Sequence, residues 1–264
     1  MEILMLMKRF RNLFFGVFLG MALSGCVKEH RGLCPCRLLL DFSSLDTSVV
    51  SLARINIVGP DGYVFDDFVG VESFAEEALV LVPKGDCWLN VYCGEQGMAV
   101  PERGLQIPYG DECPPVYMQS AYLDTDCELM SRQVLVRKNY CRLSVFVADV
   151  EHFPFSLAVK GMVAGYGADG TPADGDFFHK VETVSDEGWT ISVPRQTDDS
   201  MLLEVSDGTD VLKTFALGKY ICASGYDWNA ADLSDITVGI DYTRTKLTVS
   251  VRGWDEVYEF DVVI

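Results

Sequence analysis

The sequence predicts an all-β protein made of two tandem antiparallel β-sandwiches, and three observations lead to this expectation. Short apolar, β-branched segments recur about every ten residues along most of the chain. Turn sequences containing proline and glycine separate many of these segments. The helical period is nearly absent, since only residues 71–78 look helical at all. Evenly spaced strands with turn chemistry between them are typical of sandwich folds.

The predicted strands of the first half form hairpins. Pro60-Asp61-Gly62 joins two of them, because proline presets φ and glycine accepts a positive φ. Pro83-Lys84-Gly85 joins two more in the same way. The expected strands are 36–43, 52–58, 63–69, 78–82 and 86–93. Residues 94–115 hold four glycines and four prolines and therefore predict a long loop.

Strands resume at residue 134 and continue to the end of the sequence. They are expected at 134–137, 141–147, 155–163, 189–193, 201–205, 211–217, 236–241, 246–251 and 257–264, with a loop over 165–176. Sandwich domains usually run about 100 residues, so this length suits two. The expected division is a signal peptide over 1–25, a tether over 26–35, one sandwich over 36–133 and a second over 134–264.

The N-terminal residues have the pattern of an export signal. Lys8, Arg9 and Arg11 precede an apolar run over residues 13–23. As a helix this run spans about 16 Å, roughly half of a bilayer core, so it fits a signal peptide better than a transmembrane span. Met7 is an alternative start, since Met-Lys-Arg is a more typical opening.

A cysteine follows the apolar run directly. Leu23-Ser24-Gly25-Cys26 matches the lipobox of bacterial lipoproteins. We therefore expect cleavage between Gly25 and Cys26 and acylation of the Cys26 thiol, which becomes the new N-terminus. The alternative is a free cysteine after an ordinary signal peptide.

The charge of the chain excludes nucleic acid as a partner. The net charge is −18, and it becomes −20 without residues 1–25, which carry a net +2. Binding phosphate requires lysine and arginine to replace counterions, and an acidic surface also repels anionic headgroups. Any attachment to a membrane must then come from the acyl chains on Cys26.

Eight cysteines follow Cys26, and an even number in an exported protein favours disulfides. They are Cys34, Cys36, Cys87, Cys93, Cys113, Cys127, Cys141 and Cys222. Their spacing leaves the connectivity open. The sequence has no Cys-x-x-Cys pair, and its three histidines are far apart, so we expect no metal site.

Catalytic motifs are not found in the sequence. It has no Gly-x-Ser-x-Gly elbow, no His-Glu-x-x-His pair and no phosphate-binding loop, which predicts a protein that is not an enzyme and needs no cofactor. The aspartate-rich residues 169–176 lack the spacing of a calcium loop, and a plain hairpin loop is the favoured interpretation.

The tryptophans are candidates for either core packing or ligand contact. Trp88 and Trp189 lie in predicted strands and are expected to pack. Trp228 lies in the polar stretch 224–235. We expect it either to cap one end of a sandwich or, less favourably, to be exposed for a ligand.

The last eight residues alternate with a period of two. Tyr258, Phe260, Val262 and Ile264 fall on one face of the predicted strand. This strand either completes its own domain or adds to the sheet of another subunit, where main-chain hydrogen bonds would give affinity.

Four segments in order carry a resemblance to a known family. They are Cys34-Pro35-Cys36 before the strand at 37–42, the turn and strand at 82–88, the strand pair at 134–147, and residues 249–257 with Gly253-Trp254. Together with Cys26 they resemble the fimbrium-anchoring subunits of Bacteroidia, the fimbrillin-associated anchor family. The high cysteine count and the short length depart from the family pattern.

The resemblance implies two transthyretin-like sandwiches on an outer-membrane lipid anchor, exposed at the cell surface. Their role would be to hold a fimbrium and limit its length, with edge strands including 257–264 contacting the first pilin. Two alternatives stay open: a surface glycan-binding lipoprotein, and a stalk or tip subunit of the same pilus superfamily.

Overall fold

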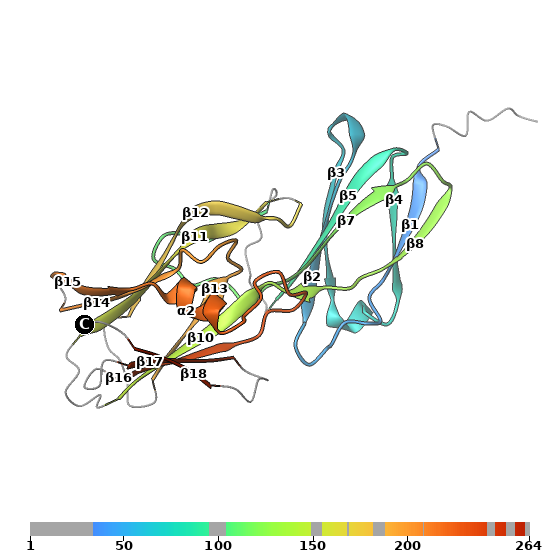
Figure 1. The fold of residues 1–264 in the computed structure, drawn as a ribbon. Helices are drawn as coiled ribbons and strands as arrows, with labels where there is room; N and C mark the ends of the chain where they lie inside the picture. Colours follow the sequence, from blue (N-terminus) through green and yellow to red (C-terminus); the bar gives the residue numbers. More distant parts are fainter. Residues whose placement is uncertain are drawn as a thin grey trace, which may run out of the picture. The chain divides into compact units, whose positions relative to one another are not determined.

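The computed structural model describes residues 34–94, 104–148, 155–167, 169–181, 188–207, 209–241, 246–251 and 257–261. They form an all-β fold, which confirms the predicted class (Figure 1). The strands make four sheets. Among these residues no helix has the length and apolar character needed to cross a bilayer.

The first two sheets come from residues 36–138. Their strands are β1 (Cys36–Asp41), β2 (Leu52–Val58), β3 (Val64–Gly70), β4 (Glu77–Val82), β5 (Asp86–Gly94), β7 (Tyr117–Asp124), β8 (Leu129–Gln133) and β9 (Arg137–Lys138). One sheet has the order β4-β1-β8 and the other β3-β2-β5-β7-β9. Leu38 and Leu40 of β1 share one apolar cluster with Ile55 and Ile57 of β2. The two sheets therefore pack face to face, since alternate residues of a strand point to one face.

The other two sheets are built mainly from residues 140–261. Their strands are β10 (Tyr140–Val147), β11 (Ser156–Gly167), β12 (Pro172–Val181), β13 (Trp189–Pro194), β14 (Leu202–Ser206), β15 (Val211–Phe215), β16 (Ile236–Asp241), β17 (Lys246–Val251) and β18 (Val257–Asp261). The orders are β13-β10-β16-β17-β18 and β12-β11-β14-β15. Leu143 and Val145 of β10 join Val159 of β11 and Leu203 of β14 in one cluster, so these sheets also form a sandwich.

Two strand pairs are parallel, although the other pairs are antiparallel. β1 lies between β4, which is antiparallel to it, and β8, which is parallel. β10 lies in the same way between antiparallel β13 and parallel β16. The first strand of each sandwich, β1 or β10, is thus an inner strand of its sheet with one antiparallel and one parallel neighbour. This similarity of topology is not visible as a sequence repeat.

Helical structure differs from the prediction at two places. Residues 71–78 form only the short 3-10 turn η3 (Val71–Ser73) before β4 begins. Helix α2 (Leu217–Ala223) follows β15 and was not predicted. It buries Leu217 and Ile221, four residues apart on one face, against the second sandwich core. A helix of seven residues with β-branched and aromatic members has little local signal, so tertiary packing decides its conformation.

The predicted loops are partly strands. β6 (Gly104–Gln106) lies inside the expected loop 94–115 and pairs with the end of β11. The expected loop 165–176 is mostly a hairpin, because β11 continues to Gly167 and β12 starts at Pro172. Leu105 and Tyr166, which face each other across β6 and β11, pack with Tyr92 and Met118 in a small third cluster. This non-local contact outweighs the glycine and proline content that predicted a loop.

The pairing of β6 with β11 predicts that Gly165→Ala destabilises the protein. A Cβ at this position would lie 2.1 Å from the main-chain oxygen of Leu105, so the two strands must separate. We expect a loss of about 1–3 kcal/mol in the free energy of unfolding, measured by urea denaturation. In Gly62→Ala the new Cβ meets no atom within 4 Å and only the positive φ of 77° is unfavourable, so the loss should be smaller. Equal losses in the two variants would contradict the pairing.

Candidate functional site

The predicted cleavage and lipidation site, Gly25 and Cys26, lies outside the described residues. The predicted contact strand is described over β18, which holds Tyr258 and Phe260, whereas Val262 and Ile264 lie outside it. β18 pairs antiparallel with β17 and stands at the end of its sheet. Among the described strands β17 is its one sheet neighbour, and the end of a sheet is a place where another strand can add.

A surface ion pair joins the side chains of Lys246 and Glu259 on β17 and β18. Lys246 Nζ of β17 lies 3.1 Å from Glu259 Oε2 of β18. The Lys246 side chain is 42% exposed and the Glu259 side chain 62%, and ion pairs with this much exposure contribute little to stability. Glu259 is thus an accessible position on the edge strand at which a chemical probe disturbs little.

Trp88 and Trp228 lie in surroundings that differ from one or more of the predicted ones. Trp88 is 45% exposed and does not pack in the core as predicted. Cys87 and Leu89 of β5 face the core, so Trp88 between them must face the opposite side, where it meets Tyr122 edge-on at 5.8 Å. Trp228 is only 5% exposed, so the ligand-contact interpretation is wrong and its capping interpretation fits. Trp189 packs in the core as predicted.

The start of the aspartate-rich segment 169–176 forms a turn. Asp169 Oδ1 accepts hydrogen bonds from the Thr171 hydroxyl at 2.6 Å and from its N–H at 3.1 Å, which lowers the pKa of the Asp169 carboxyl. Gly170 has a φ of 75° and completes the turn between β11 and β12. The turn is shorter than the predicted loop over 169–176, because β12 already begins at Pro172.

The eight cysteines are unbonded thiols in this structure. Cys36, Cys87, Cys93, Cys113 and Cys141 are buried, Cys127 is half-buried, and Cys34 and Cys222 are exposed. Cys36 Sγ and Cys127 Sγ lie 3.6 Å apart. Disulfide pairing of these residues stays a prediction.

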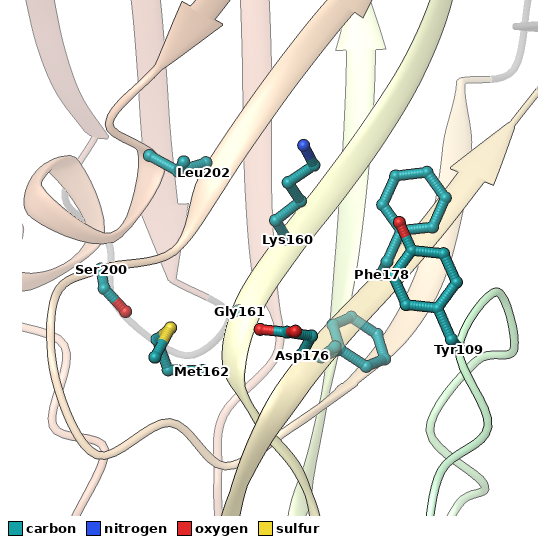
Figure 2. A pocket seen from close by; sticks show the side chains of 9 residues that line it. Tyr109, Lys160, Gly161, Met162, Asp176, Phe178, Ser200 and Leu202 are labelled. Atoms are coloured by element: carbon teal, nitrogen blue, oxygen red, sulfur yellow. The ribbon is translucent and has the colours of Figure 1, made fainter.

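A hollow that the sequence did not indicate lies on the outer face of the sheet β12-β11-β14. Its volume is about 320 Å³. The lining residues are Tyr109, Lys160, Gly161, Met162, Asp176, Phe177, Phe178, Ser200 and Leu202. Figure 2 shows Tyr109 and Phe178 on one side of it and Met162 and Ser200 on the other, with Asp176 between them.

The aromatic side of the hollow is held by a loop that runs along β12. Gly110 N–H donates to the Phe178 carbonyl at 2.9 Å, and Gly110 O lies 2.9 Å from His179 Nδ1. These contacts place the Tyr109 ring flat on Phe178, with centroids 4.7 Å apart and planes 8° from parallel. Tyr109 nevertheless stays 69% exposed, so its outer ring face is open to a ligand.

The polar groups of the hollow offer both donors and acceptors. Lys160 Nζ lies 2.9 Å from Glu204 Oε1 and 5.8 Å from the Phe178 ring centre. Asp176 and Ser200 add a carboxylate and a hydroxyl. An open aromatic face beside a carboxylate, a hydroxyl and an ammonium group suits a ligand with many hydroxyls. Tyr109 and Lys160 are far apart in sequence, so no local motif could reveal this arrangement.

Comparisons with known proteins find the same fold in solved structures. No protein-family model matches the sequence, and no curated protein sequence matches it. A candidate polysaccharide-binding protein from Bacteroides thetaiotaomicron is similar with a TM-score of 0.61 and 10% identity, over 85% of this chain and 98% of that one. A candidate adhesin from the same species gives 0.57 and 12%, over 84% and 97%.

A fimbrial protein is also among the similar structures. The fimbrial anchor protein Mfa2 from Porphyromonas gingivalis is similar with a TM-score of 0.57 and 14% identity, over 84% of this chain and 98% of that one. At these identities the likeness establishes the fold. The resemblance that the sequence suggested is confirmed at that level.

Proposed function

We propose that this chain is an outer-membrane lipoprotein that anchors a fimbrium at the cell surface through non-catalytic contacts with fimbrial subunits. The observation that carries the proposal is the fold shared with a fimbrial anchor protein over 98% of that protein's length. The lipobox ending at Cys26 supplies the attachment. The acidic surface provides no electrostatic attraction to the anionic headgroups of the membrane.

The proposed organisation is a tether from Cys26 followed by two sandwiches. Val134 packs in the first apolar cluster, and β9 pairs with β7 of the first sandwich. Both contacts favour a boundary just after Lys138, a few residues beyond the boundary expected from the sequence. The second sandwich then begins with β10.

The proposed contact with the first fimbrial subunit is edge strand β18. It is the last strand in the order of its sheet, and adding an extended segment of a partner to such a strand is a common way in which sheets bind peptides. A photo-reactive benzophenone amino acid at Glu259 should therefore cross-link the protein to a fimbrial subunit in intact cells. The same probe at Val64, an exposed position on edge strand β3 of the other sandwich, is the matched control. Cross-linking of the subunit from Val64 and not from Glu259 would refute this contact.

Glycan binding is a second candidate function, and the hollow beside Tyr109 favours it. Its open aromatic face and mixed polar groups suit a sugar ring, and one protein of this fold is a candidate polysaccharide-binding protein. Affinity electrophoresis in gels containing bacterial or host polysaccharides tests the idea. If it is right, a polysaccharide retards the protein and Tyr109→Ala abolishes the retardation. Tyr122→Ala, which removes an exposed tyrosine outside the hollow, should leave it unchanged. Unretarded migration in every gel rejects the glycan function.

A further inference from the structure

Two thiols meet at the point where the described chain enters its first strand. Cys36 is the first residue of β1 and is fully buried. Cys127 lies in the turn between β7 and β8 and is half-buried. Their Sγ atoms are 3.6 Å apart although the residues are separated by 91 positions in sequence. A disulfide requires a sulfur–sulfur distance of about 2.05 Å, so a small side-chain rotation brings them into bonding range.

The backbone around the two thiols is already fixed. Arg37 N–H donates to the Glu128 carbonyl at 3.0 Å, one residue beyond each cysteine. The parallel ladder between β1 and β8 continues from there, with Arg37 opposite Leu129. These hydrogen bonds hold the backbone segments that carry the two cysteines next to each other, as a bond between the thiols requires.

The nearby Cys87 is engaged elsewhere. Its Sγ lies 3.7 Å from the Thr125 hydroxyl and 3.9 Å from the Pro83 carbonyl. Cys34, two residues before Cys36, is exposed. Among these three thiols, Cys127 is therefore the one in direct contact with the Cys36 thiol.

We propose that Cys36 and Cys127 form a disulfide after export, and that this bond fastens β1, the strand that leads to the tether, to the body of the first sandwich. The oxidant is the disulfide of a thiol-oxidising protein of the exported compartment. The Cys127 thiolate attacks that disulfide and forms a mixed disulfide, releasing one thiol of the oxidant. Cys36 then loses its proton and attacks the Cys127 sulfur, and the second thiol leaves. Two protein thiols are oxidised and one disulfide is reduced to two thiols.

The order of these steps follows from burial. Desolvation, together with the contact to Cys127, raises the pKa of the Cys36 thiol to about 11, so Cys36 stays protonated at neutral pH. Cys127 is the more accessible thiol and can reach an oxidant from solvent. It is therefore the first to react.

The bond would change how force passes through the protein, a consequence that rests on the proposed anchoring function. A pull between the lipid on Cys26 and the fimbrium acts first on β1, which only hydrogen bonds and side-chain packing hold between β4 and β8. With Cys36 joined to Cys127, the pull enters the turn before β8 as well and bypasses the hydrogen bonds of β1. The sandwich then resists loss of its first strand.

The test is mass spectrometry on the full chain purified from the membrane. Free thiols are alkylated in denaturant, the protein is digested without reduction, and the linked peptides are identified. We expect one linked pair containing Cys36 and Cys127. Full alkylation of both residues in the native protein, or a bond from Cys36 to another cysteine, overturns the proposal.

Stability provides an independent readout. Cys127→Ser should lower the thermal midpoint by roughly 10 °C, as expected for a cross-link that closes so long a loop. Cys36→Ser and the double variant should lower it about as much, because each removes the same bond, and reductant should lower only the parent protein. Cys222→Ser, at an exposed thiol, should change nothing. Additive losses in the double variant would show two separate thiols and overturn the proposal.

The mechanical role is tested separately from anchoring itself. Cells carrying Cys127→Ser should shed more fimbriae under controlled shear than parent cells, while both keep their fimbriae at rest. If the linked peptide is present but shedding is equal, the bond exists without the mechanical role. The anchoring function itself is tested by the Cys26→Ala variant and not by the Cys36 and Cys127 variants.

Discussion

Replacing Cys26 with alanine is expected to release the protein from the membrane fraction and the fimbriae from the cell. The acyl chains are the one attractive contact with the bilayer that the proposal contains. Two or more chains make anchoring stable, whereas a net charge of −20 after residue 25 gives anionic headgroups no electrostatic attraction. Metabolic labelling with a palmitate analogue should mark the parent protein and not the variant. Fractionation should move nearly all of the variant into the soluble pool, and electron microscopy should show long, detached fimbriae.

Cys34→Ala is the matched control for that experiment. It removes an exposed thiol eight positions further along the chain and leaves the lipobox intact. Labelling, fractionation and fimbrial attachment should all match those of the parent. A Cys26→Ala protein that stays in the membrane pellet, with fimbriae of normal length on the cell, would end the anchoring proposal.

The fold class was predictable because short apolar segments separated by turn residues are a local property of the sequence. In β1 the buried Cys36, Leu38 and Leu40 alternate with Arg37, Leu39 and Asp41, which are more exposed, although the run Leu38–Leu40 hides part of this alternation in the sequence. The turn at Pro60–Gly62 was also readable, and β2 and β3 pair around it as expected. Local chemistry decides these features, so no knowledge of distant contacts is needed.

Features that depend on distant contacts could not be read in the same way. The face on which Trp88 lies is fixed by the register of the whole strand. In that register the neighbouring Leu89 faces the core and Trp88 faces the opposite side. The hollow needs Tyr109 from one loop and Ser200 from another, 91 positions later. Tyr117 and Tyr140, whose hydroxyls lie 3.3 Å apart, likewise meet across the end of one sandwich and the start of the next. Sequence spacing carries no signal for such pairs.

Arg195 is the clearest residue that sequence analysis missed, and Arg195→Ala is expected to destabilise the protein strongly. Its guanidinium follows β13 and donates to the carbonyls of Trp228, Ala230 and Ala231 and to Asn139 Oδ1; the bond to Ala230 measures 2.8 Å and the bond to Asn139 3.1 Å. The loop held in this way places Trp228 over the second core. Alanine would leave three main-chain acceptors without this charged donor. We expect a loss of about 3 kcal/mol in the free energy of unfolding.

Chemical denaturation and tryptophan fluorescence together identify the cause of that loss. If the loop detaches, Trp228 meets water and its emission shifts to longer wavelength before the main unfolding transition. Arg195→Lys keeps the charge but lacks the planar fork that reaches several carbonyls, so it should recover only a minor part of the stability. Arg137→Ala is the control, because this exposed arginine makes a surface ion pair with Asp232 at 3.5 Å and should cost less than about 1 kcal/mol. A loss for Arg195→Ala no larger than that of Arg137→Ala would mean that packing alone, without the guanidinium, holds the loop in place.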